Sequence, residues 1–195
     1  MAAAEDSGGV VGLGLCVVDH LYVVERLDLR DERTRYRQRL ICAGGMVAGA
    51  LAQVAQLGGR AELLSVLGDD AEGRFLRRAL SRAGVGTRGV RRSRALPTTV
   101  ALVLVAARGG GRRFVVPARR PLERRAPRLD LSAIRRGRAL LVDGHFPIDA
   151  ARAVRRAASL GVPVVGDFNR PSAEALSLLP HVDYAVVPEE FARAF

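Results

Sequence analysis

The stretch that sets the fold is Ala43-Gly44-Gly45-Met46-Val47-Ala48-Gly49-Ala50-Leu51-Ala52-Gln53-Val54-Ala55-Gln56-Leu57-Gly58-Gly59. It opens with paired glycines, continues with apolar residues at helical spacing and stops at a second glycine pair, which predicts a helix between the two pairs. Glycines at a helix start let the backbone approach a ligand closely, and free N–H groups there favour oxygen-rich or anionic groups. A tight turn that only feeds a core helix is the alternative interpretation.

A strand and a second helix follow this stretch. Leu63-Leu64-Ser65-Val66-Leu67 predicts a short apolar strand, and the acidic turn Gly68-Asp69-Asp70-Ala71-Glu72-Gly73 leads into an amphipathic helix over 69–83. This order of glycine-pair helix, strand, Gly-Asp-Asp-x-x-Gly turn and helix resembles the ribokinase (PfkB) family of carbohydrate kinases. The resemblance runs over nearly the whole chain. It implies an α/β fold with a mostly parallel central sheet flanked by helices and a small β lid, incomplete at the C-terminus.

Length and composition indicate one domain over residues 1–195. A chain of 195 residues with 49% hydrophobic content can bury one substantial core. The net charge of +11 alone would suggest a polyanionic partner, but all 31 basic residues are arginine and they are scattered. Aromatic content is only 5%, too little for a platform on which bases stack. We therefore expect no nucleic acid as partner and keep an Arg-rich nucleic-acid binder as an alternative.

The cysteines and the N-terminus favour a cytoplasmic protein. Cys16 and Cys42 form no CxxC pair, and no His/Cys cluster has metal-ligand spacing, so reduced intracellular thiols fit best. The N-terminus has no basic segment before an apolar run, so we expect no signal peptide. No apolar stretch is long enough to cross a bilayer, so we expect no membrane partner.

The first strand carries a candidate binding residue. The apolar run Val10–His20 is interpreted as one buried strand with Asp19 at or just past its carboxyl end, where open α/β sheets bind ligands. An ordinary turn aspartate is the alternative. The resemblance implies that Asp19 binds sugar hydroxyls. It also implies one lost contact, because Val17 stands where some relatives have asparagine.

Two segments predict exposed β structure. Residues 32–41 alternate polar side chains, and residues 98–105 and 112–116 flank a glycine turn as in a hairpin. The resemblance implies that segments at about 32–42 and 97–117 form a lid that covers the sugar site and often mediates homodimerisation. An edge hairpin of the main sheet is the alternative. Residues 117–128 are rich in proline and arginine and predict a loop.

Strands and helices then alternate, which favours a parallel sheet. We expect strands near 139–142, 162–167 and 184–187, with helices over 149–160 and 172–179. Polar residues follow these strands and would converge with Asp19 on one edge of the sheet: Asp143, His145, Asp167 and Asn169. Carboxylates and amides at such an edge suit a polyhydroxyl substrate. Ordinary turn or capping roles are the alternative for His145, Asp167 and Asn169.

The resemblance and the positions after strand ends together imply roles for these residues. Substrate would be held by Asp19, Gly44, Gly45, Gly49 and His145, although Gly49 stands where the family has asparagine. Phosphate and metal would lie near Asp167, Asn169, Glu189 and Glu190. Here the family's Asn-x-x-Glu is changed, because Pro188 takes the asparagine position and Phe191 the final glutamate position.

The resemblance implies an ATP- and Mg²⁺-dependent phosphotransferase acting on a hydroxyl of a sugar or sugar-like compound. The family's catalytic aspartate, in Gly-Ala-Gly-Asp, is expected downstream of Phe195 and does not occur in these 195 residues. We therefore expect no catalytic residue in this chain and no useful phosphorylation by it alone. A non-catalytic sugar-binding or dimerising protein derived from such a kinase is the alternative function.

Overall fold

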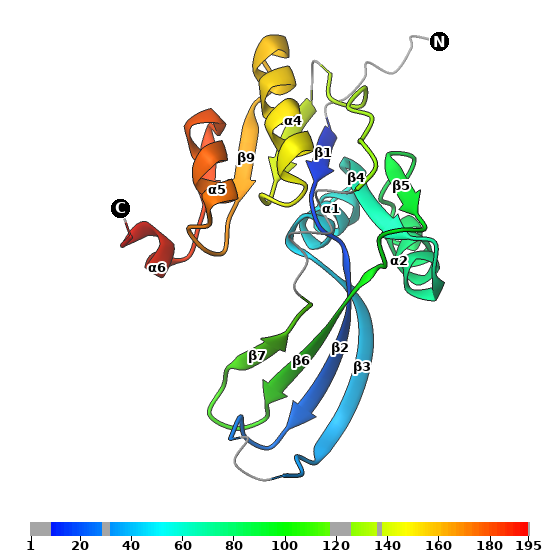
Figure 1. The fold of residues 1–195 in the computed structure, drawn as a ribbon, viewed down its shortest axis with the longest axis vertical. Coiled ribbons are helices and arrows are strands. Elements are labelled where there is room, and N and C mark those ends of the chain that lie inside the picture. Colours follow the sequence, from blue (N-terminus) through cyan, green and yellow to red (C-terminus); the bar gives the residue numbers. More distant parts are fainter. Residues whose placement is uncertain (1–8, 29–31, 118–125, 136–137, 195) are drawn as a thin grey trace.

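The computed structural model describes residues 9–28, 32–117, 126–135 and 138–194 (Figure 1). In chain order the elements are β1 (Gly9–Leu13), β2 (Val17–Val24), β3 (Tyr36–Gly44), α1 (Met46–Gln56), β4 (Arg60–Gly68), α2 (Ala71–Arg82), β5 (Val90–Ser93), β6 (Thr99–Ala106), β7 (Arg112–Val115), β8 (Arg138–Val142), α4 (Pro147–Leu160), β9 (Val164–Asp167), α5 (Ala173–Leu178), a 3₁₀ turn (Leu179–His181), β10 (Tyr184–Val186) and α6 (Glu189–Ala192). Most predicted helices and strands are therefore present near their expected bounds.

The main sheet has six parallel strands in the order β10-β9-β8-β1-β4-β5. Strand β4 is buried on both faces: Leu64 and Val66 join a core cluster with α4, whereas Leu63 and Leu67 join a second cluster with α1 and α2. Continuous apolar strands of this kind are typical of parallel sheets covered by helices on both sides. The predicted α/β fold with flanking helices is confirmed.

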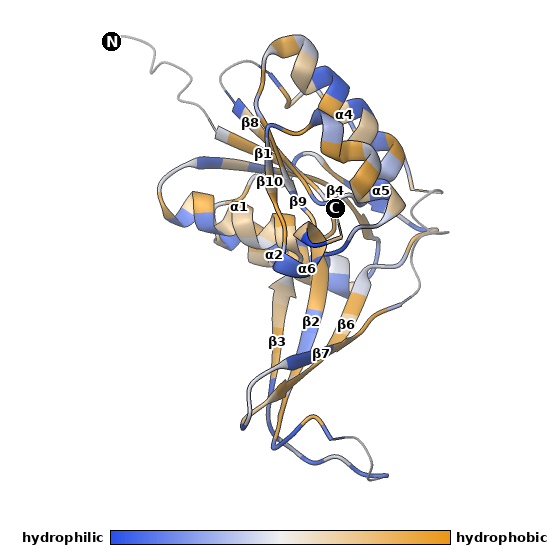
Figure 2. Ribbon diagram, turned by 90° about the vertical axis from the view of Figure 1, so that its left-hand side faces the viewer, coloured by the Kyte–Doolittle hydropathy of each residue, from blue (hydrophilic) through white to orange (hydrophobic). Residues whose placement is uncertain are grey.

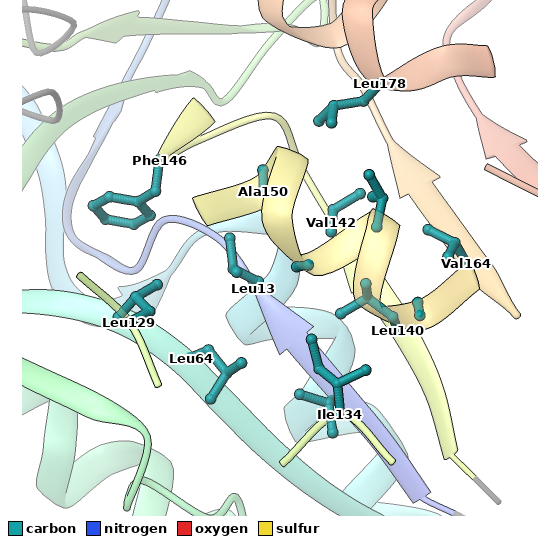
Figure 3. Close-up of a cluster of buried hydrophobic side chains, with 14 of the residues drawn as sticks. Leu13, Leu64, Leu129, Ile134, Leu140, Val142, Phe146, Ala150, Val164 and Leu178 are labelled. Atoms are coloured by element: carbon teal, nitrogen blue, oxygen red, sulfur yellow. The ribbon is translucent and has the colours of Figure 1, made fainter. Parts of the chain in front are cut away.

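The larger core cluster lies between α4 and the centre of the main sheet. Figure 3 shows Leu13 of β1, Leu140 of β8 and Val164 of β9 beneath Ala150 of α4. These side chains are at most 2% exposed. Their burial fixes the carboxyl ends of β1, β8 and β9 relative to one another, and the candidate residues follow these ends.

A second sheet has four strands in the order β3-β2-β6-β7. Strand β2 pairs antiparallel with β3 and parallel with β6, and β7 pairs antiparallel with β6. Figures 1 and 2 show this sheet projecting from one end of the main body, while the helices lie over the main sheet. The β6–β7 hairpin is therefore not an edge of the main sheet, and the alternative interpretation of this segment is wrong.

The structure corrects one predicted strand and adds a strand that was not predicted. The run 10–20 is not one strand, because the chain leaves the main sheet at Gly14 and continues as β2 in the second sheet. Strand β5 was not predicted, since only Val90 and Ser93 of its residues are buried and its two arginines hide the apolar pattern. Of the predicted loop 117–128, residues 118–125 lie outside the described part.

No helix of the described residues is both long and apolar enough to cross a membrane.

Candidate functional site

The carboxylate of Asp19 lies directly against the backbone of Gly44. Asp19 is inside β2, opposite Cys42 of β3, and not at the carboxyl end of a main-sheet strand as expected. A Cβ atom on Gly44 would come within 2.0 Å of Asp19 Oδ2, so only glycine leaves room for this carboxylate. Burial raises the pKa of Asp19 above its ordinary value, and the Arg112 guanidinium opposes part of this shift. Asp19 is thus a half-buried acceptor next to the first predicted glycine.

Gly45 forms the turn into α1. Its φ of 104° lies in the region that favours glycine, and a Cβ atom would come within 2.3 Å of the carbonyl oxygen of Leu15. No side chain caps this end of α1, and its first turn holds no acidic residue. The N–H groups of that turn therefore lack the side-chain partner that most helices have, which suits an oxygen-rich ligand.

Gly49 lies in α1, one turn after Gly45, and its amide donates to the Gly45 carbonyl at 2.9 Å. It is exposed, and a Cβ atom there would meet no atom within 4 Å. Close packing therefore does not require glycine at this position. The open space is large enough to accept the start of a longer side chain.

His145 lies on a turn of unusual backbone conformation after β8. Its neighbours Gly144 and Phe146 both have positive φ, 82° and 53°. Phe146 is only 2% exposed and points into the core cluster near Leu129 in Figure 3. The amide of His145 donates to Asp143 Oδ1 at 3.0 Å. The buried ring of Phe146 and the carboxylate of Asp143 thus hold the turn in place. His145 itself is half-buried.

The predicted phosphate and metal residues follow β9 and β10. Asp167 ends β9 in register with Val186 of β10, and burial raises its pKa. Asn169 is exposed two residues later, and Glu189 and Glu190 open α6 as exposed side chains. Glu189 pairs with Arg193 at 2.5 Å. In the described part of the chain, no group of three or more His, Cys, Asp or Glu side chains is arranged to hold a metal ion.

Phe191 packs in the hydrophobic core at this end of the molecule. It is 2% exposed, and its ring stacks on that of Phe168 with centroids 6.4 Å apart and planes at 19°. Pro188 precedes α6 in an extended conformation. An aromatic ring buried this way is structural, so the side chain at this position has no part in binding a metal.

The structure brings the candidate residues together in two groups. The segment that carries Asp19, Gly44 and Gly45 is linked to the His145 turn through Leu15, which lies against Gly45 and donates its amide to Asp143 of that turn at 2.9 Å. The acids near β9 and β10 form the second group, and β9 pairs with β8, which ends at the His145 turn. A surface hollow of about 420 Å³ between α4 and Asp130–Ser132 contains none of these residues.

Sequence reasoning missed several residues that support the site. Cys42 was noted only as a free thiol, yet it lies opposite Asp19. Ser65 is fully buried and donates to the carbonyl of Gly14 at 2.7 Å. Thr98 donates from its amide and its hydroxyl to Asp70. The signal that could have found the last two is a hydroxyl residue inside or beside an otherwise apolar strand.

The comparisons with known proteins agree with this architecture. The sequence profile described as "pfkB family carbohydrate kinase" matches residues 8–195. The chain belongs to the pfkB family of carbohydrate kinases. A comparison with curated proteins gives no match.

Solved structures of sugar kinases share the pfkB fold seen here. A candidate ribokinase from Agrobacterium tumefaciens matches with a TM-score of 0.85 and 26% identity, over 96% of this chain and 61% of its own. The Arabidopsis thaliana ribokinase complexed with ribose and ATP matches with a TM-score of 0.70 and 22% identity, over 94% of this chain and 61% of its own. A 2-dehydro-3-deoxygluconokinase from Thermotoga maritima matches with a TM-score of 0.76 and 18% identity, over 95% of this chain and 61% of its own. The chain thus spans about 61% of the length of these structures.

Proposed function

We propose that this chain is the substrate-binding portion of an ATP-dependent phosphotransferase that acts on a hydroxyl of a sugar or sugar-like compound. The proposal rests chiefly on the carboxylate of Asp19, which is held against Gly44 beside the uncapped start of α1. A carboxylate accepts two hydroxyl hydrogen bonds, and nearby backbone N–H groups suit the substrate's oxygens. Gly45, the open surface at Gly49 and the half-buried His145 would complete the contacts to the sugar.

The second sheet would act as a lid over this sugar. A lid excludes water, which would otherwise compete with the sugar hydroxyl as acceptor of the phosphoryl group. The position of Asp19 within β2 supports this role, because closure of the sheet would carry the carboxylate with it.

ATP and Mg²⁺ are part of the proposal for the whole protein. Mg²⁺ is usually held by one or two carboxylates together with phosphate oxygens, where it neutralises their charge during transfer. The exposed Glu190 and the half-buried Asp167 fit this pattern as oxygen donors at the edge of the site, although Glu189 is already paired with Arg193. Asn169 would add an amide near the phosphates. The catalytic base would come from residues outside this chain.

A titration of the 195-residue chain with ribose, fructose and 2-dehydro-3-deoxygluconate, followed by calorimetry, tests the binding step. We expect one of these or a related polyol to bind, and Asp19→Asn to weaken binding at least tenfold, because hydrogen bonds to a charged acceptor contribute about 1.5–3 kcal/mol. Asp130→Asn is the matched control, since Asp130 is exposed and its carboxylate accepts from the amide and the hydroxyl of the nearby Ser132. Equal binding by both variants would contradict the assignment of Asp19.

A non-catalytic, sugar-binding relative of these kinases is the second candidate. It is favoured by Phe191, which is buried against Phe168 where the family pattern has glutamate. A phosphorylation assay on the native gene product with ATP and the sugar that binds separates the two functions. Transfer to the sugar supports the kinase, and binding without transfer supports the alternative.

We further propose that two copies associate through the second sheet in the cytoplasm. A row of side chains crosses this sheet on one face, from Ile41 through His20 and Leu102 to Val115. Ile41 is 45% exposed, Leu102 38% and Val115 59%, which leaves an apolar strip that a second copy would cover. The two free thiols are consistent with a reducing compartment.

A further inference from the structure

The second sheet is attached to the main body partly through the short crossing between β1 and β2. At this crossing the amide of Gly14 donates to Leu64 O at 3.2 Å, and Ser65 Oγ donates to Gly14 O at 2.7 Å. The next amide, that of Leu15, donates to Asp143 Oδ2 at 2.9 Å. Ser65 is 0% exposed and Asp143 is 7% exposed, so these bonds are sheltered from water. We call Gly14 and Leu15 of this crossing the root of the second sheet. They are hydrogen-bonded to the side chain of Ser65 in β4 and to the side chain of Asp143 in the turn after β8.

Asp143 holds a second segment with its other oxygen. Its Oδ1 accepts from the amide of His145 at 3.0 Å, within the turn whose Gly144 and Phe146 have positive φ. One carboxylate therefore bridges the backbone at the root of the second sheet and the backbone of the turn that presents His145. An aspartate suits this position because both its oxygens accept, whereas an amide side chain has only one acceptor oxygen.

Close packing leaves little freedom around this bridge. A Cβ atom on Gly14 would come within 2.4 Å of Asp143 Oδ2, and one on Gly45 would come within 2.3 Å of Leu15 O. A displacement of Leu15 would therefore press on the start of α1 at Gly45 as well as pull on Asp143. The segments with four of the five proposed sugar-binding residues, Asp19, Gly44, Gly45 and His145, thus meet at Leu15 and Asp143.

We propose that Asp143 is a positioning residue that couples the root of the second sheet to the His145 turn. Movement of the sheet at Leu15 is transmitted through the carboxylate to the backbone of His145, so His145 is in place only when the sheet has its described position. The contribution of this coupling to sugar binding rests on the function proposed above. The coupling itself does not, and it is measurable without any sugar.

Hydrogen exchange of single amides, followed by NMR on the 195-residue chain without ligand, tests the bridge. Asp143→Asn keeps the shape of the side chain but turns an NH₂ group toward one of the two amides. We expect the amide of Leu15 or of His145 to exchange about tenfold faster or more, as loss of a bond to a charged acceptor predicts. Asp183→Asn is the matched control, because Asp183 Oδ2 also accepts from a backbone amide, that of Val164 at 2.7 Å, but at the amino-terminal end of β9, whereas Asp143 follows the carboxyl end of β8. It should leave both amides unchanged.

A double-mutant cycle with Ser65→Ala separates coupling from a local structural effect. Ser65→Ala frees the Gly14 carbonyl at the root, and we expect faster exchange of the His145 amide when Asp143 is present but no further change in Asp143→Asn. An unchanged His145 amide in Ser65→Ala, or equal effects in both backgrounds, would overturn the proposal. If Asp143→Asn does not fold, the single variant Ser65→Ala still decides it. Loss of sugar binding alone would bear on the proposed function and not on the bridge.

Discussion

Asp70 fastens Thr98, the residue before β6, to the main body. Its Oδ2 accepts from the Thr98 amide at 2.8 Å, and its Oδ1 accepts from the Thr98 hydroxyl at 2.7 Å and from the amide of Gly73 at 2.8 Å. The same hydroxyl accepts from the amide of Gly68 at 2.8 Å. Asp70, the second aspartate of the Gly-Asp-Asp-x-x-Gly turn, therefore caps α2 and anchors a strand of the second sheet.

Removal of this carboxylate should destabilise the protein. Asp70→Ala deletes the cap of α2 and leaves the buried amide of Thr98 unpaired, for an expected loss of about 2–3 kcal/mol in the free energy of unfolding. Urea denaturation measures the change. Asp69→Ala is the control, because Asp69 is exposed and its ion pairs with Arg92 and Arg94 contribute at most about 1 kcal/mol.

The difference in the free energy of unfolding between wild type and Asp70→Ala should depend on pH, because the pKa of Asp70 is shifted in the folded protein. Burial opposes its ionisation, but the hydrogen bonds from Thr98 and Gly73 outweigh burial and lower the pKa. A lowered pKa in the folded state means that the stabilisation is present above the unfolded value of about 3.9 and is lost as pH falls below it. The difference between wild type and Asp70→Ala should therefore shrink below about pH 4. A constant difference down to pH 2 would show that the charge of Asp70 has no part in it.

Gly44 and Gly49 should respond oppositely to a methyl group. Gly44→Ala forces the Asp19 carboxylate to move, so we expect weaker sugar binding in a folded protein. Gly49→Ala adds a methyl group in open space within α1 and should stabilise the protein by about 0.5–1 kcal/mol. Calorimetry with the sugar and urea denaturation measure both variants. Equal binding by Gly44→Ala and wild type would mean that the position of Asp19 does not matter to the ligand.

Gly49→Asn tests whether the departure from the family pattern weakens binding. The Cβ atom of the new side chain would meet no atom within 4 Å, so the side chain starts in open space. We expect tighter sugar binding, by about threefold to tenfold for one added hydrogen bond, with the fold unchanged. Calorimetry is again the measurement. Weaker binding by Gly49→Asn would indicate that this chain uses the space at Gly49 for a larger substrate.

The sequence predicted elements well where one physical pattern determined them. The helix α1 lies between its glycine pairs, and α5 begins within the predicted range 172–179, where Ser172 Oγ caps it by accepting from the Ala175 amide at 3.3 Å. The division of the run 10–20 between two sheets was not predictable from hydropathy, because both parts are apolar. What separates them is the contact of Leu15 with Asp143, which is 128 residues away in the chain.

For the candidate site, the sequence names residues but does not predict how they are arranged, and their roles stay predictions. The expected convergence of acids at strand ends placed Asp143 among candidate ligands, yet both its oxygens accept from backbone amides. Asp19 was expected on the main sheet and lies on the second. Such outcomes depend on long-range hydrogen bonds, which leave no periodic signal in the sequence.

The apolar strip on the second sheet should determine the oligomeric state. Leu102→Glu places a charge at the centre of the strip formed with Ile41 and Val115, and burial of an unpaired charge would oppose association. We expect sedimentation velocity to show a dimer for wild type and a monomer for Leu102→Glu. Leu57→Glu is the matched control, since Leu57 is 78% exposed at the end of α1. A wild-type monomer at high concentration would refute association through this sheet.

The alkylation rates of Cys16 and Cys42 should depend on the raised pKa values of their thiols, to which the charge of Asp19 contributes. Burial, and then the charge of Asp19, raises the pKa of Cys16 to about 12, so Cys16 should resist iodoacetamide until the protein unfolds. Cys42 is exposed, and its pKa is raised by burial of the sulfur and by Asp19. Because the thiolate is the reactive form, Asp19→Asn should lower this pKa and speed the alkylation of Cys42 near pH 7.5. The difference should vanish at high pH, where the thiolate is complete in both proteins.

Mass spectrometry of peptides after timed alkylation measures both rates. Asp130→Asn should alkylate like wild type, because Asp130 is not among the charges that raise the pKa of either cysteine. A bound sugar that contacts Asp19 would lie next to Cys42 and slow its alkylation, so the same measurement detects binding. If Cys42 reacts at the same rate in wild type and Asp19→Asn across the pH range, the charge of Asp19 does not reach the sulfur. A sugar that binds without protecting Cys42 would then have to be bound away from this face of β2 and β3.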